Sequence, residues 1–509
     1  MPPPSPFRSS AMPPAQNAPD RRRWAALAVV MTASLMDLVD VTIVNIAMPD
    51  IQRDTGASFS ALQWVTAGYA LAFAVGLITG GRLGDIHGRK RLFLLGITGF
   101  TLASALCGLA PDPQFLVAAR ILQGGTAALM VPQVLSIIHA TFPAEERGKV
   151  FGMFGAMVGL GAILGPLLGA LLTEWDLFGL GWRPIFLVNL PIGVAGLLLG
   201  ARYVDESRAP RALRLDPVGM LLGAAGLLML LYPLTQGRES GWPLWGDVTM
   251  VLSIPVLLLF VAYERAKSRR DGSPLVELSL FRVRSFAGGI GVQLCFGVAT
   301  GIFFLVWTLY MQLGLGWSPL RAGLTGVPFS IAVSVAAGLS VQKLVPRFGR
   351  KVLQTGALVM AAGTLLYLAE AEHFGTGIQS WQMTLPLVVM GAGMGLIVAP
   401  LTDAVLSEVP REHSGSASGL INTTGQLGMA LGLGLSSVAF FSVVDDAAPA
   451  PSPGPVFVHA FTHSLWWVTV GLLAVFALVF ALPGRAAQRS AVEPVEPAAA
   501  EEKEPALVG

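Results

Sequence analysis

The residues best suited to proton chemistry are two carboxylates in the first long apolar stretch of the chain. Asp37 and Asp40 lie three residues apart, which places them on one face of a helix. A charge near the centre of a bilayer costs about 2.5–3.5 kcal/mol on insertion scales, so both side chains must face protein or water and not lipid. Two neighbouring carboxylates also repel each other, which favours protonation of at least one. The pair therefore predicts a proton-carrying site.

Arg120, in the fourth apolar stretch, is the natural counter-ion for these acids. An arginine stays protonated, so it can hold a carboxylate ionised until substrate or a second proton competes. We therefore assign Asp40, Asp37 and Arg120 to proton coupling, with Asp40 as the main acid. The alternative is structural: each acid only pairs with arginine or supports a packing contact, and the ion pair only orients two helices.

A glycine-rich helix is expected in the fifth apolar stretch. Its small residues recur at intervals of four, a spacing that lets helices approach closely in lipid, and its proline removes one helix hydrogen bond. We expect this helix to bend and to pack closely between the two halves of the molecule, although packing alone would also explain the glycines. The motif consists of Gly161, Gly165, Pro166 and Gly169.

The turn after the second apolar stretch combines an acid with several cations. Asp85 lies at the end of one expected helix, and Arg89 and Lys90 lie at the start of the next, so ion pairs between helices can form on the cytoplasmic side. Anchoring to the inner leaflet would explain the cations but not the acid. We interpret this turn as a conformational latch made of Gly81, Asp85, Gly88, Arg89 and Lys90.

Several aromatic and amide side chains are candidates for the wall of a substrate cavity. Interface or core packing is the alternative interpretation for the rings. No metal site is expected, because His459 and His463 lie four residues apart without a third ligand. Asp403, near the cytoplasmic end of the twelfth stretch, is a weaker candidate for coupling. The expected cavity residues are Gln123, Trp64, Tyr69, Phe304, Trp307 and Tyr310.

These side chains must be positioned by membrane-spanning helices. Hydrophobic residues make up 53% of the chain and charged residues only 13%, which is typical of a membrane protein. A span needs about 20 apolar residues. Fourteen stretches satisfy this, near 24–46, 61–80, 92–110, 114–138, 150–172, 183–202, 215–235, 245–264, 285–312, 321–342, 352–370, 382–405, 414–443 and 461–482.

The distribution of cations predicts the orientation. With the N-terminus in the cytoplasm, only Arg53, Arg183, Arg238 and Arg321 fall on outer loops, Arg120 falls inside a span, and the other Lys and Arg lie in inner loops and tails. The positive-inside rule then places both termini in the cytoplasm of a cell membrane protein. The loops are too short for a soluble catalytic domain, and neither a nucleotide-binding loop nor a nucleophile with a base is found, so an enzyme is not expected.

The spans divide into six, two and six, because Arg-Lys turns follow spans 2 and 10 and indicate two diverged repeats. The expected units are a disordered tail over 1–20, a six-helix bundle over 21–204, a two-helix insertion over 205–270, a second six-helix bundle over 271–484 and a disordered tail over 485–509. The predicted fold class is therefore an all-α membrane protein with 14 transmembrane spans.

The motifs together resemble the major facilitator superfamily, in particular its fourteen-span drug/proton antiporter branch. Asp40 occupies the acidic position of a first-helix signature over 39–49, and Arg120, Gln123 and Gly124 fit the fourth-span motif associated with proton coupling. The latch residues fit the loop motif between spans 2 and 3, and the glycine motif of span 5 resembles the antiporter motif. The second-half copy of the loop motif is degenerate, because Pro346 stands where its aspartate would be.

The resemblance implies two bundles that rock around a central cavity, and export of small amphipathic or cationic molecules such as drugs and antibiotics in exchange for protons. It implies a monomer in the lipid bilayer that needs no cofactor beyond the proton gradient and binds no nucleic acid. A symporter or uniporter of the same fold, an exporter of one metabolite such as a siderophore or an amino acid, and a non-transporting membrane scaffold or enzyme are the alternatives.

Overall fold

The computed structural model describes residues 20–57, 59–175, 179–208, 216–237, 241–270, 274–407, 409–410, 414–446 and 453–482. Within these ranges every regular element is helical. Thirteen of the described helical segments are long and apolar enough to cross a membrane. Helix α5, 31 residues long, occupies the position of the fifth predicted span. All fourteen predicted stretches coincide with helices, and most of these helices extend beyond the apolar stretch at one or both ends.

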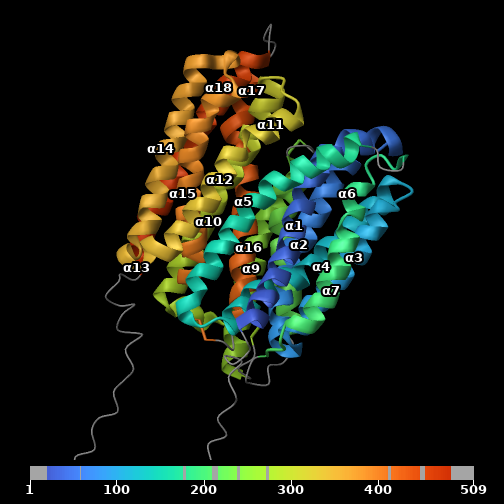
Figure 1. Cartoon of the computed structure of the whole chain (residues 1–509), viewed down its shortest axis with the longest axis vertical. Helices are drawn as coiled ribbons and strands as arrows, with labels where there is room; N and C mark the ends of the chain where they lie inside the picture. Colours follow the sequence, from blue (N-terminus) through green and yellow to red (C-terminus); the bar gives the residue numbers. More distant parts are fainter. Residues whose placement is uncertain are drawn as a thin grey trace, which may run out of the picture.

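The first half of the chain forms one bundle. Its helices α1, α3 and α7 pack together, α2 packs on α4, and α5 packs on α1. In Figure 1 this bundle is coloured blue to green. The helices are α1 (Asp20–Thr55), α2 (Phe59–His87), α3 (Arg89–Gly108), α4 (Pro113–Thr141), α5 (Ala144–Glu174), α6 (Pro184–Leu187) and α7 (Asn189–Tyr203).

The second half forms a bundle beside the first, coloured yellow to red in Figure 1. Segments of π-helix follow α10, α12 and α16. The helices are α10 (Arg284–Leu309), α11 (Pro319–Thr325), α12 (Val327–Leu339), α13 (Val345–Phe348), α14 (Lys351–Phe374), α15 (Ser380–Ser407), α16 (Ser414–Ser436), α17 (Ser442–Asp446) and α18 (Pro453–Leu478). Between the bundles in sequence, α8 (Pro217–Gln236) and α9 (Leu244–Arg270) form a hairpin, and α8 contacts α2 and α16.

Several helices begin at the same local signal, a short polar residue followed by proline. Asp112 accepts a hydrogen bond from Phe115 N (2.8 Å), and Asp216 caps α8 by accepting one from Gly219 N (3.0 Å). Such a cap satisfies a free N–H group, and proline suits the first helical position because it has no N–H to satisfy. The sequence thus sets these helix starts locally.

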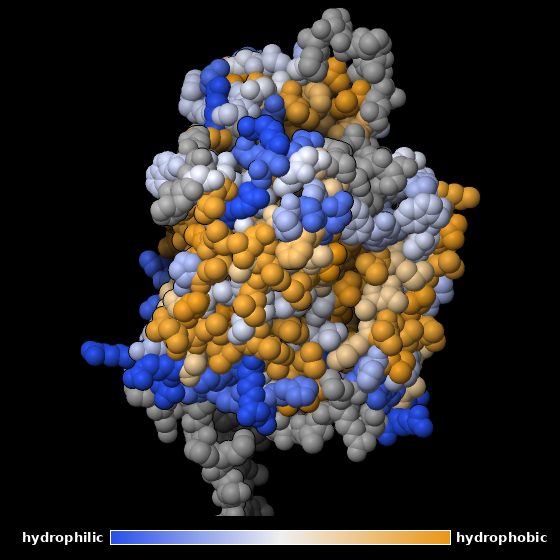
Figure 2. Space-filling model, turned by 90° about the vertical axis from the view of Figure 1, so that its right-hand side faces the viewer, coloured by the Kyte–Doolittle hydropathy of each residue, from blue (hydrophilic) through white to orange (hydrophobic). Residues whose placement is uncertain are grey.

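The surface confirms a multi-pass membrane protein. Figure 2 shows a broad apolar belt around the middle of the molecule, with hydrophilic residues gathered above and below it. Large apolar side chains on the outward faces include Leu199 of α7, Leu258 of α9 and Leu385 of α15. Exposed apolar surface of this extent is stable in contact with lipid, not with water.

The two bundles meet near the α2–α3 turn, at what we call the latch end. A Cβ added to Gly419 of α16 would lie only 2.7 Å from Leu77 O of α2, so the helices touch backbone to backbone. Ser136 of α4 donates to Ser418 of α16 (3.3 Å), and Gly155 of α5 lies against Ala337 of α12. The molecule is therefore closed at the latch end in this conformation.

Candidate functional site

The centre of the first bundle holds a buried ion pair between α1 and α4. Arg120 Nη1 donates to Asp40 Oδ2 at 2.5 Å, and both side chains are fully buried. Arg120 Nε also donates to Val65 O of α2 at 3.0 Å. A single arginine therefore links three helices, and two of the three residues assigned to coupling from the sequence lie in direct contact.

Amide side chains complete the polar environment of Asp40. Gln123 Nε2 donates to Asp40 Oδ1 (2.8 Å) and Asn189 Nδ2 donates to the same oxygen (2.7 Å). Gln123 Oε1 accepts from Arg120 Nη1 at 2.7 Å. Because three donors converge on its two oxygens, Asp40 has the surroundings of a carboxylate in this conformation.

Asp37 lies beside this group, bound to a different partner. Tyr69 of α2 donates its hydroxyl proton to Asp37 Oδ1, and the ring of Tyr69 lies 4.3 Å from the Arg120 guanidinium carbon. No cation is paired with Asp37 in the described part of the chain. Tyr69 thus connects the two acids: its hydroxyl holds Asp37, while its π face contacts the cation that holds Asp40.

Two residues of the site were missed in the sequence. Asn189 begins α7 where the helix is interrupted after α6, and Ser104 of α3 accepts a hydrogen bond from Gln123 Nε2 at 2.8 Å. An asparagine inside an apolar span is a detectable signal, because a lipid-facing amide would be costly. Ser104 has no such signal. Gln123 was expected at the cavity wall, but the structure places it fully inside the ion-pair group.

The latch residues join the two bundles through one carboxylate. Asp85 Oδ1 accepts from Arg89 Nη2 at 2.9 Å, and Asp85 Oδ2 accepts from the backbone N–H of Ser416 at 3.1 Å. Ser416 belongs to the first turn of α16, where a negative charge is favoured by the helix dipole. Gly88 has a φ of 111°, which a side chain rarely adopts.

Lys90 and Gly81 have more local contacts. Lys90 Nζ donates to Ala201 O of α7 at 2.7 Å, and its backbone N–H donates to Glu206 Oε1 at 3.1 Å. Gly81 is buried on α2. Of the five latch residues, Asp85 therefore forms a hydrogen bond that crosses between the bundles, and Arg89 supports Asp85 through an ion pair.

The expectation for the glycine helix needs a correction. A Cβ on Gly165 would collide with Thr42 of α1, and one on Gly161 would lie 2.9 Å from Leu38 Cβ of α1. These two glycines therefore allow α1 and α5 to pack within the first bundle, not between the bundles. Gly152 and Gly155, about two to four turns earlier, are α5 glycines that face α12. Gly169 is buried, and Pro166 lies inside the same continuous helix.

The aromatic residues of the second half that were expected at a cavity wall pack against other side chains instead. Tyr310 is fully buried and stacks on Phe461 with ring centroids 4.3 Å apart. Trp307 Nε1 donates to Tyr367 at 2.9 Å, and Phe304 packs edge to face on Phe329. In this conformation Tyr310 and Trp307 belong to the core of the second bundle.

Trp64, on α2, packs against Tyr232 of the inserted hairpin, with centroids 5.5 Å apart. The described residues contain no group of three or more His, Cys, Asp or Glu side chains placed to hold a metal ion. His463 Nδ1 lies 2.8 Å from Ala439 O.

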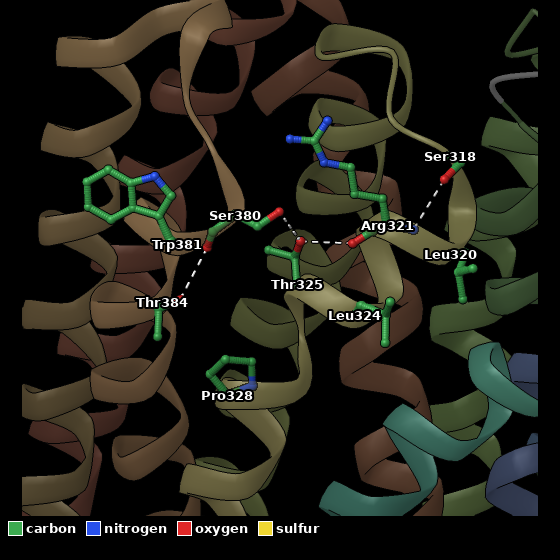
Figure 3. A pocket seen from close by; sticks show the side chains of 9 residues that line it. All are labelled: Ser318, Leu320, Arg321, Leu324, Thr325, Pro328, Ser380, Trp381 and Thr384. Carbon is green, nitrogen blue, oxygen red and sulfur yellow. Dashed lines mark hydrogen bonds between the residues drawn. The ribbon is translucent and has the colours of Figure 1, made fainter.

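A cavity of about 480 Å³ opens between α11–α12 and α15, away from the ion pair. Figure 3 shows the Thr325 and Ser380 hydroxyls joined across it (2.9 Å), while the Arg321 guanidinium points away from them. None of the cavity residues expected from the sequence lines it. It therefore shares no residue with the Asp40 site.

Two packed helical bundles with an ion pair buried in one of them define a polytopic membrane transporter. The chain belongs to the Major Facilitator Superfamily, whose family model matches residues 30–433. It is 45% identical over 88% of its length to a probable actinorhodin transporter of Streptomyces coelicolor, covering 77% of that protein. The resemblance found in the sequence is confirmed.

Other relatives are resistance and export proteins. The puromycin resistance protein pur8 of Streptomyces alboniger is 36% identical, with 91% of each chain covered. The multidrug resistance protein Stp of Mycobacterium tuberculosis is 36% identical over 84% of this chain and 78% of its own. The crystal structure of the human organic anion transporter MFSD10 superposes with a TM-score of 0.65 over 91% of this chain and 100% of its own, at 15% identity, and supports the fold alone.

Proposed function

We propose that this protein is a proton-coupled antiporter that exports small amphipathic or cationic molecules, such as antibiotics, across the cell membrane. Relatives at 34–45% identity that are named as export or resistance proteins support the substrate class. The observation that carries the coupling is the buried Asp40–Arg120 pair, because a protonatable acid held by a permanent cation links protonation to helix packing.

In the proposed cycle, a proton that binds Asp40 removes the charge that holds Arg120. Arg120 then keeps only its neutral acceptors, Gln123 and Val65 O, so the tie between α1 and α4 weakens. A cationic substrate competes for the same carboxylate, so proton and substrate occupy it in turn. Each net charge that moves down 100 mV supplies about 2.3 kcal/mol, so the exchange of one proton for one uncharged substrate could concentrate the substrate roughly fiftyfold.

The latch end supplies the second half of the cycle. We propose that it faces the cytoplasm, with both termini on that side, because the Lys and Arg of the short loops gather there. The Asp85 bond to the first turn of α16 then stabilises the state that is closed to the cytoplasm. The transporter works as a monomer and needs no cofactor, because the proton gradient drives each step.

Transport into inverted membrane vesicles tests the proposal. Energised vesicles that contain the protein should accumulate puromycin or ethidium, and an uncoupler should abolish the accumulation. Addition of substrate to proteoliposomes should release protons. Vesicles without the protein are the control. Accumulation that persists with the uncoupler would rule out proton antiport, and substrate movement in the same direction as protons would establish a symporter.

A further inference from the structure

The inserted hairpin contains a buried pair of carboxyl groups outside the site described above. Asp216 is the residue that caps α8, and Glu264 lies near the end of α9. Both side chains are fully buried. Asp216 Oδ1 accepts from Gly219 N (3.0 Å) and from the Tyr263 hydroxyl (3.1 Å), and Glu264 Oε2 accepts from Val276 N (3.0 Å). One oxygen of each carboxyl group is therefore satisfied.

The other two oxygens point at the same place. Asp216 Oδ2 and Glu264 Oε1 have no hydrogen-bond partner among the residues that the structure describes. A Cβ added to Gly219 would collide with both, so they converge beside this glycine, and the two side chains are within hydrogen-bonding reach. Two carboxylates facing each other away from water would repel strongly, whereas one shared proton would satisfy both oxygens.

An arginine of the latch end faces this pair. Arg82 of α2 is 1% exposed, and its Nε and one Nη have no hydrogen-bond partner among the described residues. It lies within electrostatic range of Asp85, Glu264, Glu277 and Asp216. From α9, Tyr263 donates its hydroxyl proton to Asp216, and Lys267 lies within electrostatic range of Tyr263. Helix α16, which packs on α8, carries no charged residue.

We propose that Asp216 and Glu264 share one proton and form a second proton-binding site, which ties the inserted hairpin to the latch through Arg82. Loss of this proton adds a negative charge beside Arg82. The added charge attracts Arg82 toward the hairpin and away from Asp85. Asp85 is the residue that accepts the hydrogen bond from Ser416 of the second bundle. The protonation state of the hairpin pair thereby changes the electrostatic environment of Asp85, the residue that joins the two bundles at the latch end.

Infrared spectroscopy of the full-length protein in nanodiscs tests the site without transport. A difference spectrum between acidic and alkaline pH should contain a protonated carboxyl band that is absent in both Glu264→Gln and Asp216→Asn. Asn remains a good helix cap, and Gln can donate to the Asp216 oxygen as the shared proton does, so both variants should fold. Asp247→Asn, which removes an exposed carboxyl group of α9, is the matched control and should keep the band.

Two further measurements sharpen the result. Arg82→Gln should move the midpoint of the band to higher pH, because removal of a cation favours the protonated form. The melting temperature of the parent should fall as the pair loses its proton, and that of Glu264→Gln should not. A band of parental intensity in both pair variants would overturn the proposal. So would a band that responds to replacement of sodium by choline at constant pH, because the pair would then hold a metal cation.

Discussion

The two bundles have the same architecture but very different interiors. Among the described residues, the first bundle buries Asp37, Asp40, Arg120, Asp85 and Arg89, whereas the polar residues buried in the second are only serines and threonines. The centre of the second bundle is filled by rings, with Tyr310 stacked on Phe461 and Trp307 bonded to Tyr367. The first bundle therefore holds the buried acid and cation pairs, whereas the core of the second is mostly apolar and aromatic.

The largest expected difference concerns Asp40. Asp40→Asn keeps the size of the side chain but cannot cycle a proton, and it leaves the Arg120 charge buried without a counter-ion, at a cost of about 3–5 kcal/mol. Uphill efflux and substrate-induced proton release from proteoliposomes should both be lost, while binding of an uncharged substrate, which does not need the carboxylate, remains. Asp37→Asn should do less damage, and Arg120→Lys should weaken coupling because lysine lacks the planar fork.

Trp307→Phe is the matched change in the second bundle. It removes the hydrogen bond to Tyr367 and should leave proton release intact. Full release by the Asp40 variant, with loss in Asp37→Asn, would reverse the roles of the two acids. Full release by both would remove α1 from the coupling mechanism.

A second contrast separates packing within a bundle from packing between bundles. Gly165→Leu would force α1 and α5 apart, and overpacking of this kind costs about 1–3 kcal/mol, so the melting temperature should fall and export should fail. Gly155→Leu would push α5 away from Ala337 of α12. It should leave the first bundle intact but increase labelling of single cysteines at the latch end.

Gly291→Leu, on α10, serves as the control for both variants, because a Cβ at Gly291 meets nothing within 4 Å. Normal export by well-expressed Gly165→Leu protein would show that the α1–α5 contact tolerates bulk. Equal cysteine labelling in Gly155→Leu and the parent would refute its place in the interface between bundles.

Substitution of a latch residue should have a smaller effect on transport than the changes above. We expect this effect at the first-half turn and not at the corresponding second-half turn. Asp85→Asn weakens a charge-assisted bond to Ser416 N, and such bonds contribute about 1.5–3 kcal/mol. The population should shift roughly 10- to 100-fold toward the state that is open at the latch end, measured as labelling of single cysteines there. Arg350→Gln, at the corresponding second-half turn, loses bonds to Phe480 O and Leu482 O of the same bundle and should shift labelling much less. Equal labelling of both variants and the parent would exclude a latch.

The smallest effect is expected at the opposite end of the first bundle. Hydrogen bonds from Trp182 and Arg183 lower the pKa of Asp54 below its ordinary value. A lowered folded-state pKa stabilises the fold above about pH 4, and this contribution disappears as the pH falls through the folded-state pKa. In Asp54→Asn, the melting temperature should therefore decrease slightly less than in the parent as the pH falls below about 4. Because Asp54 is half exposed, a shift of many degrees would contradict a local role.

Many features of this protein could be predicted from the sequence because they depend on neighbouring residues. The fourteen apolar stretches coincide with helices, since a run of about 20 apolar residues has few alternatives in lipid. Asp37 and Asp40 lie on one helix face because the helical period places them there. Arg120 was expected beside Asp40 because a lone charge in a membrane span requires a partner.

Contacts between helices were decided only by the tertiary structure. Spacing along one helix does not say which neighbour it meets, so Gly165 was expected between the bundles but packs on Thr42 of α1. The same reason explains why Asn189 was missed and why Tyr310 is buried in the second bundle. Asp216 and Glu264, 48 positions apart, become a pair only because α8 and α9 fold back on each other. The apolar and polar pattern of the sequence determined which groups must avoid lipid, whereas the packing of the helices determined which residues they contact.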